Sequence, residues 1–201
     1  MSAEKFDPFV SEWISFSKNP NYNLIEKCLK MAQILEYPEL DISKYIEKIN
    51  DMSNSLKAKI GKVKNSTYLI SMLNEHLFDE LGFYGAEEDY YDPGNSFLNI
   101  VLDKKTGIPI TLSIIYSEVA KNIGLDLQIV GFPGHVIVKY KDEVILDPFY
   151  RGRLLTIEDL EGILNRNFGE DVEFVPEYLN SATAEQLLTR LLRNLKNAYT
   201  Q

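Results

Sequence analysis

Apolar side chains at helical spacing organise the first half of the chain. One stripe predicts a helix over residues 24–35, because its members recur every three or four positions: Leu24, Ile25, Cys28, Leu29, Ala32 and Leu35. The helix should end before Tyr37-Pro38, since the residue before a proline disfavours the α conformation. The same spacing predicts helices over residues 41–60 and about 66–81. With the aromatic stretch from Phe6 to Phe16, which we expect to pack mainly into the core, they give a helical layer over residues 1–85.

From residue 90 the pattern changes to turns and two further helices. Asp92-Pro93-Gly94-Asn95 has the composition of a turn, and residues 97–102 predict a short apolar helix. Pro109 is expected in the first turn of a longer helix, where its missing N–H does no harm. This helix should run to Gly124, which stands where a left-handed cap is expected. Its apolar positions are Ile110, Ile114, Ile115, Val119 and Ile123.

Extended segments follow over residues 127–132, 135–140 and 143–147, and the last two alternate apolar and polar positions as strands do. If residues 140–142 form the hairpin loop, Lys139 pairs with Glu143 and His135 lies opposite Asp147. Directly opposed side chains share one face of a sheet, with Cβ atoms about 5 Å apart. An imidazole held by a carboxylate is the base and orienter of a nucleophilic site. The same spacing is also explained if His135 is only a hydrogen-bonded structural histidine and Asp147 only a turn residue before Pro148. The pattern therefore leaves both a catalytic and a structural interpretation open.

The end of the chain predicts two more helices. The first starts at Thr156, an N-cap residue followed by acidic side chains, and runs to about residue 165. The second starts at a capping box from Thr183 to Gln186. It carries a strong apolar stripe, which either closes the domain or faces a further repeat array: Leu187, Leu188, Leu191, Leu192 and Leu195.

Composition narrows the class of protein. A chain of 201 residues with 45% hydrophobic residues fits one globular domain. A net charge of −9 argues against binding nucleic acid or an anionic membrane through a general basic surface. No signal-peptide pattern or membrane-length apolar run is present, and one cysteine forms no internal disulfide, which favours the cytoplasm. We expect no cofactor and no metal site, since His76, expected to be partly exposed, has no His or Cys nearby.

Four sequence segments between Tyr90 and Phe149 resemble the SirB family of the transglutaminase-like superfamily: YYDPGNSFLN, TGIPITLSIIY, VGFPGHVIVKY and ILDPF. The segment EYPELDISKYIEKI resembles the helical lead-in of the same family, so the likeness covers roughly residues 24–196. The resemblance implies an α+β fold, in which the helical N-terminal layer packs on a papain-like core with a small antiparallel sheet. It also implies one domain over residues 1–201, with a core from residue 86 onward. Members of the family often carry tetratricopeptide repeats after this domain.

The resemblance also points to a missing nucleophile. In active transglutaminase-like enzymes a cysteine stands two residues after the glycine that precedes the long helix, and alignment on Gly107 and Gly124 places that position on Pro109. His135 and Asp147 match the base and its orienter. We therefore expect a catalytically degenerate domain that acts in protein binding or regulation. Cys28 lies within an apolar stripe and is expected to be a buried hydrophobe.

Two further possibilities remain open at this stage. Ser113 lies one turn after Pro109 on the same helix face, and with His135 and Asp147 it defines an alternative, hydrolase or peptidase activity. One helical turn displaces the nucleophile by about 5 Å, which weighs against this alternative. Tyr90, Tyr91, Arg151 and Arg153 are candidate binding residues beside the site; the two arginines suit a carboxylate or phosphate, or else pair with the protein's own acidic side chains.

Overall fold

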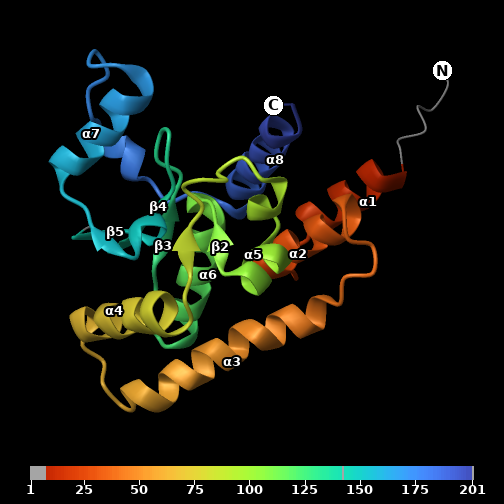
Figure 1. Ribbon diagram of the computed structural model, residues 1–201, viewed down its shortest axis with the longest axis horizontal. Helices are drawn as coiled ribbons and strands as arrows, with labels where there is room; N and C mark the ends of the chain where they lie inside the picture. The colour runs from red at the N-terminus through yellow and green to blue at the C-terminus, as the bar shows by residue number, and fades with distance from the viewer. Residues whose placement is uncertain (1–7, 142, 201) are drawn as a thin grey trace.

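Four helices form the N-terminal part of the computed structural model, which describes residues 8–141 and 143–200 (Figure 1). They are α1 (Pro8–Ser17), α2 (Leu24–Leu35), α3 (Ile42–Ile60) and α4 (Ser66–Asn74). The side chains of Asn23, Asp41 and Asn65 cap α2, α3 and α4 by accepting a backbone N–H that the first turn leaves without a partner. The bounds of α2 and α3 confirm the helices predicted from apolar spacing. Trp13 packs partly against the core, while Phe6 lies outside the described residues.

The helix predicted over residues 66–81 changes its hydrogen-bonding pattern midway. After α4 the chain continues as a π-helix, η1 (Glu75–Glu80). His76 lies in this segment and is only 2% exposed, so the expectation of a partly exposed histidine was wrong. Its Nδ1 lies 2.6 Å from a Glu80 carboxylate oxygen, and its Nε2 lies 3.0 Å from the Met52 carbonyl. These two polar partners, one of them on α3, allow the ring to be buried without losing hydrogen bonds.

Helix α6 (Pro109–Asn122) lies at the centre of the fold, above α3 in Figure 1. Every residue from 109 to 117 is buried, because α6 packs against α2, α3, α4 and α5 (Leu98–Lys104) as well as the sheet. Pro109 is the first helical residue, where proline is tolerated because the first-turn N–H has no helical partner. Gly124 follows the helix with a φ of 86°, which confirms the predicted left-handed cap.

The main sheet is antiparallel, with four strands in chain order: β3 (Gln128–Val130), β4 (Ile137–Tyr140), β5 (Val144–Asp147) and β6 (Arg153–Leu154). A parallel pair, β1 (Tyr84–Gly85) and β2 (Thr106–Gly107), lies apart from it. Along β4 the side chains alternate between two cores: Val136 and Val138 pack toward α6, and Ile137 packs with α7 (Ile157–Phe168) on the other face. The helical layer and the small antiparallel sheet form the expected α+β fold.

The hairpin between β4 and β5 differs in register from the prediction. Tyr140 pairs with Val144 and Lys139 with Ile145, so Lys139 does not pair with Glu143. Tyr140 remains in the strand, where it packs against the core, and the turn begins at Lys141, which has a left-handed φ of 53°. Asp142, assigned to the predicted loop, lies outside the described residues. The shift is two residues, and an even shift leaves every side chain on its predicted face.

The remaining segments surround the sheet and end in α8 (Ala184–Thr200), with 3₁₀ turns at η2 (Pro93–Ser96), η3 (Pro148–Tyr150) and η4 (Pro176–Leu179). Thr183 and Gln186 form the predicted capping box through reciprocal backbone bonds of 2.8 and 3.2 Å. The apolar stripe of α8 is buried in the main core, so this helix closes the fold; its fully buried members are Leu187, Leu188, Leu191 and Leu195. Within the described part of the chain, no helix has both the length and the apolarity to cross a membrane.

Truncating the stripe of α8 tests this packing. Leu191→Ala removes a side chain with 0% exposure and should lower the free energy of unfolding by about 2–5 kcal/mol, because it leaves a cavity. Leu35→Ala serves as the control, because this side chain at the end of α2 is 49% exposed. It should change the free energy of unfolding by at most about 0.5 kcal/mol. Urea unfolding followed by circular dichroism measures both values. Equal effects would show that α8 does not close the core.

Candidate functional site

His135 and Asp147 meet at the end of the β4–β5 hairpin. Nε2 of His135 lies 2.8 Å from Oδ2 of Asp147, although the two residues are diagonal neighbours and not directly opposed as predicted. Asp147 is 1% exposed, and its second oxygen accepts the backbone N–H of Phe149 at 3.0 Å. A buried carboxylate with two donors is fully engaged and can hold the imidazole in one orientation. Since an ionised carboxylate only accepts, Nε2 carries the proton of the neutral ring.

The backbone before β4 positions the imidazole. Pro133-Gly134 form the predicted turn, and Gly134 has a φ of 73°, where a side chain would also collide with Asn167. The backbone N–H of His135 donates to the Phe132 carbonyl at 3.1 Å. Tyr150 stacks on the ring, with centroids 6.3 Å apart and an angle of 24° between planes. Because Nε2 of His135 is bonded to Asp147, Nδ1 is the ring nitrogen that has no partner among the described residues. Nδ1 is therefore the nitrogen available to a ligand.

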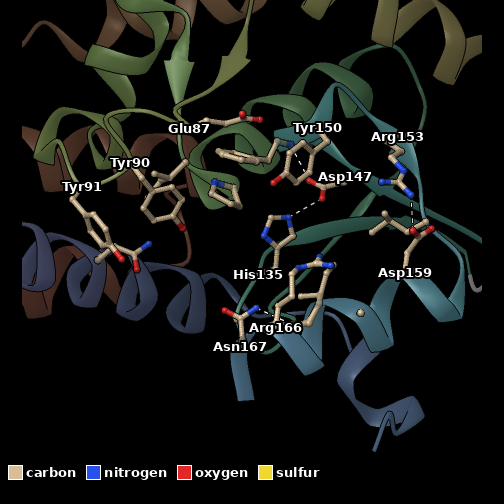
Figure 2. Close-up of a pocket in the computed structure, with 18 of the residues that line it drawn as sticks. Glu87, Tyr90, Tyr91, His135, Asp147, Tyr150, Arg153, Asp159, Arg166 and Asn167 are labelled. Atoms are coloured by element: carbon tan, nitrogen blue, oxygen red, sulfur yellow. Dashed lines mark hydrogen bonds and ion pairs between the residues drawn. The ribbon is translucent and has the colours of Figure 1, made fainter. Parts of the chain in front are cut away.

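His135 and Asp147 line a cleft with a volume of about 780 Å³. The cleft is bounded by the first residues of α6, the end of the hairpin, α7 and the last turns of α8. Figure 2 shows the labelled side chains of the hairpin end, His135 and Asp147, and those of α7, Asp159, Arg166 and Asn167. Tyr90 and Tyr91 line it and make an edge-to-face pair with centroids 5.3 Å apart. Arg153 lines it as well and bonds to Asp159 at 2.5 Å. Three of the four predicted binding residues therefore border the same cleft as the His–Asp pair.

Pro109, the residue that the sequence resemblance aligns with the nucleophile position, borders this cleft. It lines the cleft together with His135 and begins α6. A proline side chain has no nucleophilic atom, and its ring nitrogen carries no N–H. The preceding N–H, that of Ile108, donates to Oγ1 of Thr111 at 3.1 Å. At the N-terminus of α6, Pro109 therefore provides neither a nucleophilic atom nor a backbone N–H. Acyl-transfer enzymes use the N–H of the nucleophile itself to bind an oxyanion.

The structure places two predicted residues away from the cleft. Ser113 is fully buried beneath the sheet, with its Oγ 3.5 Å from the Val136 carbonyl. It does not border the cleft, because the next turn of α6 already lies inside the core. Arg151 points the other way and forms an ion pair with Asp79. Among the described residues, no group of three or more His, Cys, Asp or Glu side chains could hold a metal ion.

Cys28 is buried in α2, as the apolar stripe predicted, and does not border the cleft. Burial raises the pKa of its thiol from 9.0 to about 12. At neutral pH the reactive thiolate is therefore scarcer than for an exposed cysteine by roughly a thousandfold. Cys28 is not a substitute for the missing nucleophile.

Sequence reasoning missed several residues of the cleft. Ser96 lies within the segment YYDPGNSFLN and Tyr150 directly follows ILDPF, but neither was chosen as a site residue; Arg166 and Asn167 come from a segment with no motif. Asn194 and Asn197 of α8 also line the cleft. No periodicity signals such residues, because only the packing of α7 and α8 against the hairpin brings them together.

Replacing Asp147 by asparagine tests the orienting role of the carboxylate. In Asp147→Asn the amide oxygen must accept from Phe149 N–H, so the amide NH₂ faces Nε2 and the ring proton should move to Nδ1. Nitrogen NMR of the two imidazoles distinguishes the tautomers. His76 has other partners and serves as an internal control, whose signals should not change. Unchanged His135 signals would show that Asp147 does not set the tautomer.

Comparison with known proteins identifies the family of the chain. A UPF0162 protein of Xylella fastidiosa is 34% identical over 170 residues, which are 82% of this chain and 60% of that protein. F-box only protein 21 of Homo sapiens is 29% identical over 153 residues, 68% of this chain and 24% of that protein. The chain thus spans less than two thirds of the length of each of these relatives. No solved structure matches it. The family model described as transglutaminase-like superfamily matches residues 43–193, and the chain therefore belongs to that superfamily.

Proposed function

We propose that this domain binds a segment of another polypeptide in its cleft and has lost the thiol chemistry of transglutaminase-like enzymes. The observation that carries the proposal is Pro109, which stands at the start of α6 and faces the same cleft as His135. Covalent acyl transfer requires a nucleophile within hydrogen-bond reach of its base. Proline supplies none, and it also removes one oxyanion donor.

Among the described residues, the other candidate nucleophiles, Cys28, Ser113 and Ser96, make no hydrogen bond to His135. The thiol of Cys28 lies in the core, and Ser113 is buried with its hydroxyl near the Val136 carbonyl. Ser96 lines the cleft, but its hydroxyl makes no hydrogen bond to His135 among the described contacts. A base that touches no nucleophile has no proton to abstract. The His135–Asp147 pair is better explained as part of a binding site.

The lining of the cleft suits a polypeptide. Tyr91 and Tyr150 are each at least half exposed at its border and offer rigid, amphipathic contact area, as aromatic residues do at protein interfaces. Three asparagines, Asn167, Asn194 and Asn197, line it from α7 and α8. Each carboxamide both donates and accepts, so it can pair with the N–H and C=O of an extended backbone. The cleft volume of about 780 Å³ accommodates a few residues of such a segment.

Binding can be tested with a pair of tryptophan substitutions on α7. Gly162 lines the cleft, and the nearest side chain to an added Cβ is the flexible Arg166, so Gly162→Trp should fill the cleft without strain. Glu161→Trp places the same ring on the exposed, outward side of the helix as the matched control. Peptides selected from a random library should bind wild type and Glu161→Trp equally, and Gly162→Trp at least about tenfold more weakly. Fluorescence anisotropy measures this; equal binding to all three proteins would place recognition outside the cleft.

Restoring the nucleophile tests the lost chemistry. In Pro109→Cys the introduced thiol should react with iodoacetamide at least about a hundredfold faster than Cys28, whose pKa is raised to about 12. Cys28 is thus a control within the same molecule, and mass spectrometry assigns the label. Adding His135→Gln should slow the introduced thiol by removing its base. Wild-type protein should not react with acyl-donor or serine-directed probes; rapid, saturable labelling of it would overturn the proposal.

A further inference from the structure

The described residues that line the cleft carry an excess of negative charge. Five are carboxylates and two are guanidiniums: Glu87, Asp92, Asp147, Glu158 and Asp159 against Arg153 and Arg166. The chain as a whole has the same sign, with a net charge of −9, so the rest of the protein does not offset this excess. A cleft lined by one sign of charge attracts ligands of the opposite sign.

Two of these carboxylates are left without an opposite charge. The other three are paired: Asp147 with His135, Asp159 with Arg153 and Asp92 with Lys104. Glu87 and Glu158 are exposed and have no ion-pair partner in the described part of the chain. Glu87 precedes η2 and Glu158 lies in the first turn of α7, so they border the cleft from different segments. In the view of Figure 2, Glu87 and the α7 residue Asp159 lie on opposite sides of His135.

The imidazole of His135 gives an independent indication that the ligand is a hydrogen-bond donor. Its Nε2 carries the ring proton and lies 2.8 Å from Oδ2 of Asp147. In the neutral ring Nδ1 is then an acceptor, and it has no partner among the described residues. An N–H group of a ligand satisfies this nitrogen, whereas a carboxylate or a carbonyl oxygen does not.

Exposed aromatic rings border the same cleft. Tyr91 and Tyr150 line it and are 56% and 50% exposed. The face of a tyrosine ring attracts the ammonium of lysine and, more often, the guanidinium of arginine. These two side chains also carry N–H donors and no acceptor. Lysine and arginine therefore match the charge of the cleft, its unpaired nitrogen and its aromatic border.

We propose that the polypeptide segment bound in the cleft is basic, with a lysine or arginine side chain that donates to Nδ1 of His135 and further positive charge that faces Glu87 and Glu158. This inference rests on the proposed peptide-binding function and names the chemistry of the segment. A peptide fits the cleft better than a small cation does. The three asparagines that line the cleft can pair with a peptide backbone while the carboxylates attract its side chains.

Arg166 limits how basic the segment can be. It lines the cleft from α7 and has no ion-pair partner within residues 8–141 and 143–200. Its guanidinium repels a cation placed next to it and favours a backbone carbonyl or a carboxylate there. We therefore expect a mixed segment, whose basic side chains lie away from Arg166, and not a continuous run of positive charges.

Two matched peptide pools test the proposal with the full chain. Both consist of fluorescein-labelled random hexapeptides with a pair of lysines at fixed positions. In one pool these lysines are acetylated on Nζ, which removes their charge. Fluorescence anisotropy should show that the lysine pool binds at least about tenfold more tightly than the acetylated pool at low salt. The preference should shrink between 0.1 M and 1 M salt, because the Debye length falls from about 10 Å to about 3 Å.

Neighbouring carboxylates provide matched controls. Glu87→Gln and Glu158→Gln should each weaken binding of the lysine pool by about two- to fivefold, the range expected for an exposed pair of charges. Glu88→Gln and Glu161→Gln remove the same charge from exposed residues that do not line the cleft, and should leave binding unchanged. Arg166→Gln should have the opposite effect and strengthen binding of the lysine pool. The acetylated pool should bind all five variants like wild type, which shows that the fold is intact.

The outcomes separate the two proposals. Equal binding of both pools, lost in Gly162→Trp, would overturn the basic preference and leave the peptide-binding function intact. A loss in Glu88→Gln as large as that in Glu87→Gln would trace the preference to the net charge of the whole chain, which also overturns it. If neither pool binds, both proposals fail.

A small probe tests the contact with His135. N-acetyllysinamide should shift the nitrogen NMR signal of its Nδ1 saturably and leave the signals of His76 unchanged, since both ring nitrogens of His76 have partners within the protein. An unchanged Nδ1 signal would contradict the proposed contact. Spermidine provides the third arm of the experiment. If it displaces the lysine pool at concentrations as low as the unlabelled pool does, the cleft is a general cation site and the assignment to a peptide is wrong.

Discussion

The complete burial of α6 over residues 109–117 is the constraint on which the rest of the structure depends. This part of the helix can present chemistry only at its N-terminus, because its flanks are occupied by packing. Polar anchors reinforce this position: the Tyr116 hydroxyl donates to Asn74 at 2.7 Å, and Asn74 donates to the Gly152 carbonyl at 3.2 Å. Gly152 has a φ of 70°, and a side chain there would collide with Asn74. The same network thus fixes α6, α4 and the loop that follows Asp147.

Asp147 is buried with both oxygens engaged, so it can hold the imidazole of His135 in one orientation. In the function that we propose, this pair is a base and its orienter without a nucleophile, because Pro109 offers the imidazole no atom to activate.

The region matched by the superfamily model, residues 43–193, contains Pro109, His135 and Asp147, whereas Asn194 and Asn197 of the cleft lie just beyond it. It leaves α1 and α2 outside, and these helices contribute to the core without lining the cleft. The relatives are longer than this chain, which covers 60% of one UPF0162 protein and 24% of F-box only protein 21. The proposed peptide binding therefore concerns this domain and no further part of those proteins.

The amino-acid sequence by itself determined the helices and the identity of the His–Asp pair. Apolar periodicity, asparagine and aspartate caps and Gly124 are local signals, so α2, α3 and α6 followed from them directly. His135 and Asp147 lie on the same face as predicted although the predicted register was wrong by two residues, because side chains in a strand repeat every two residues. Tertiary structure alone decided the rest. It buried Ser113 and His76, turned Arg151 toward Asp79, and exposed Ser96 to a cleft with Arg166 and Asn167. These outcomes depend on which segments pack together across long distances in the chain, and no local pattern encodes them.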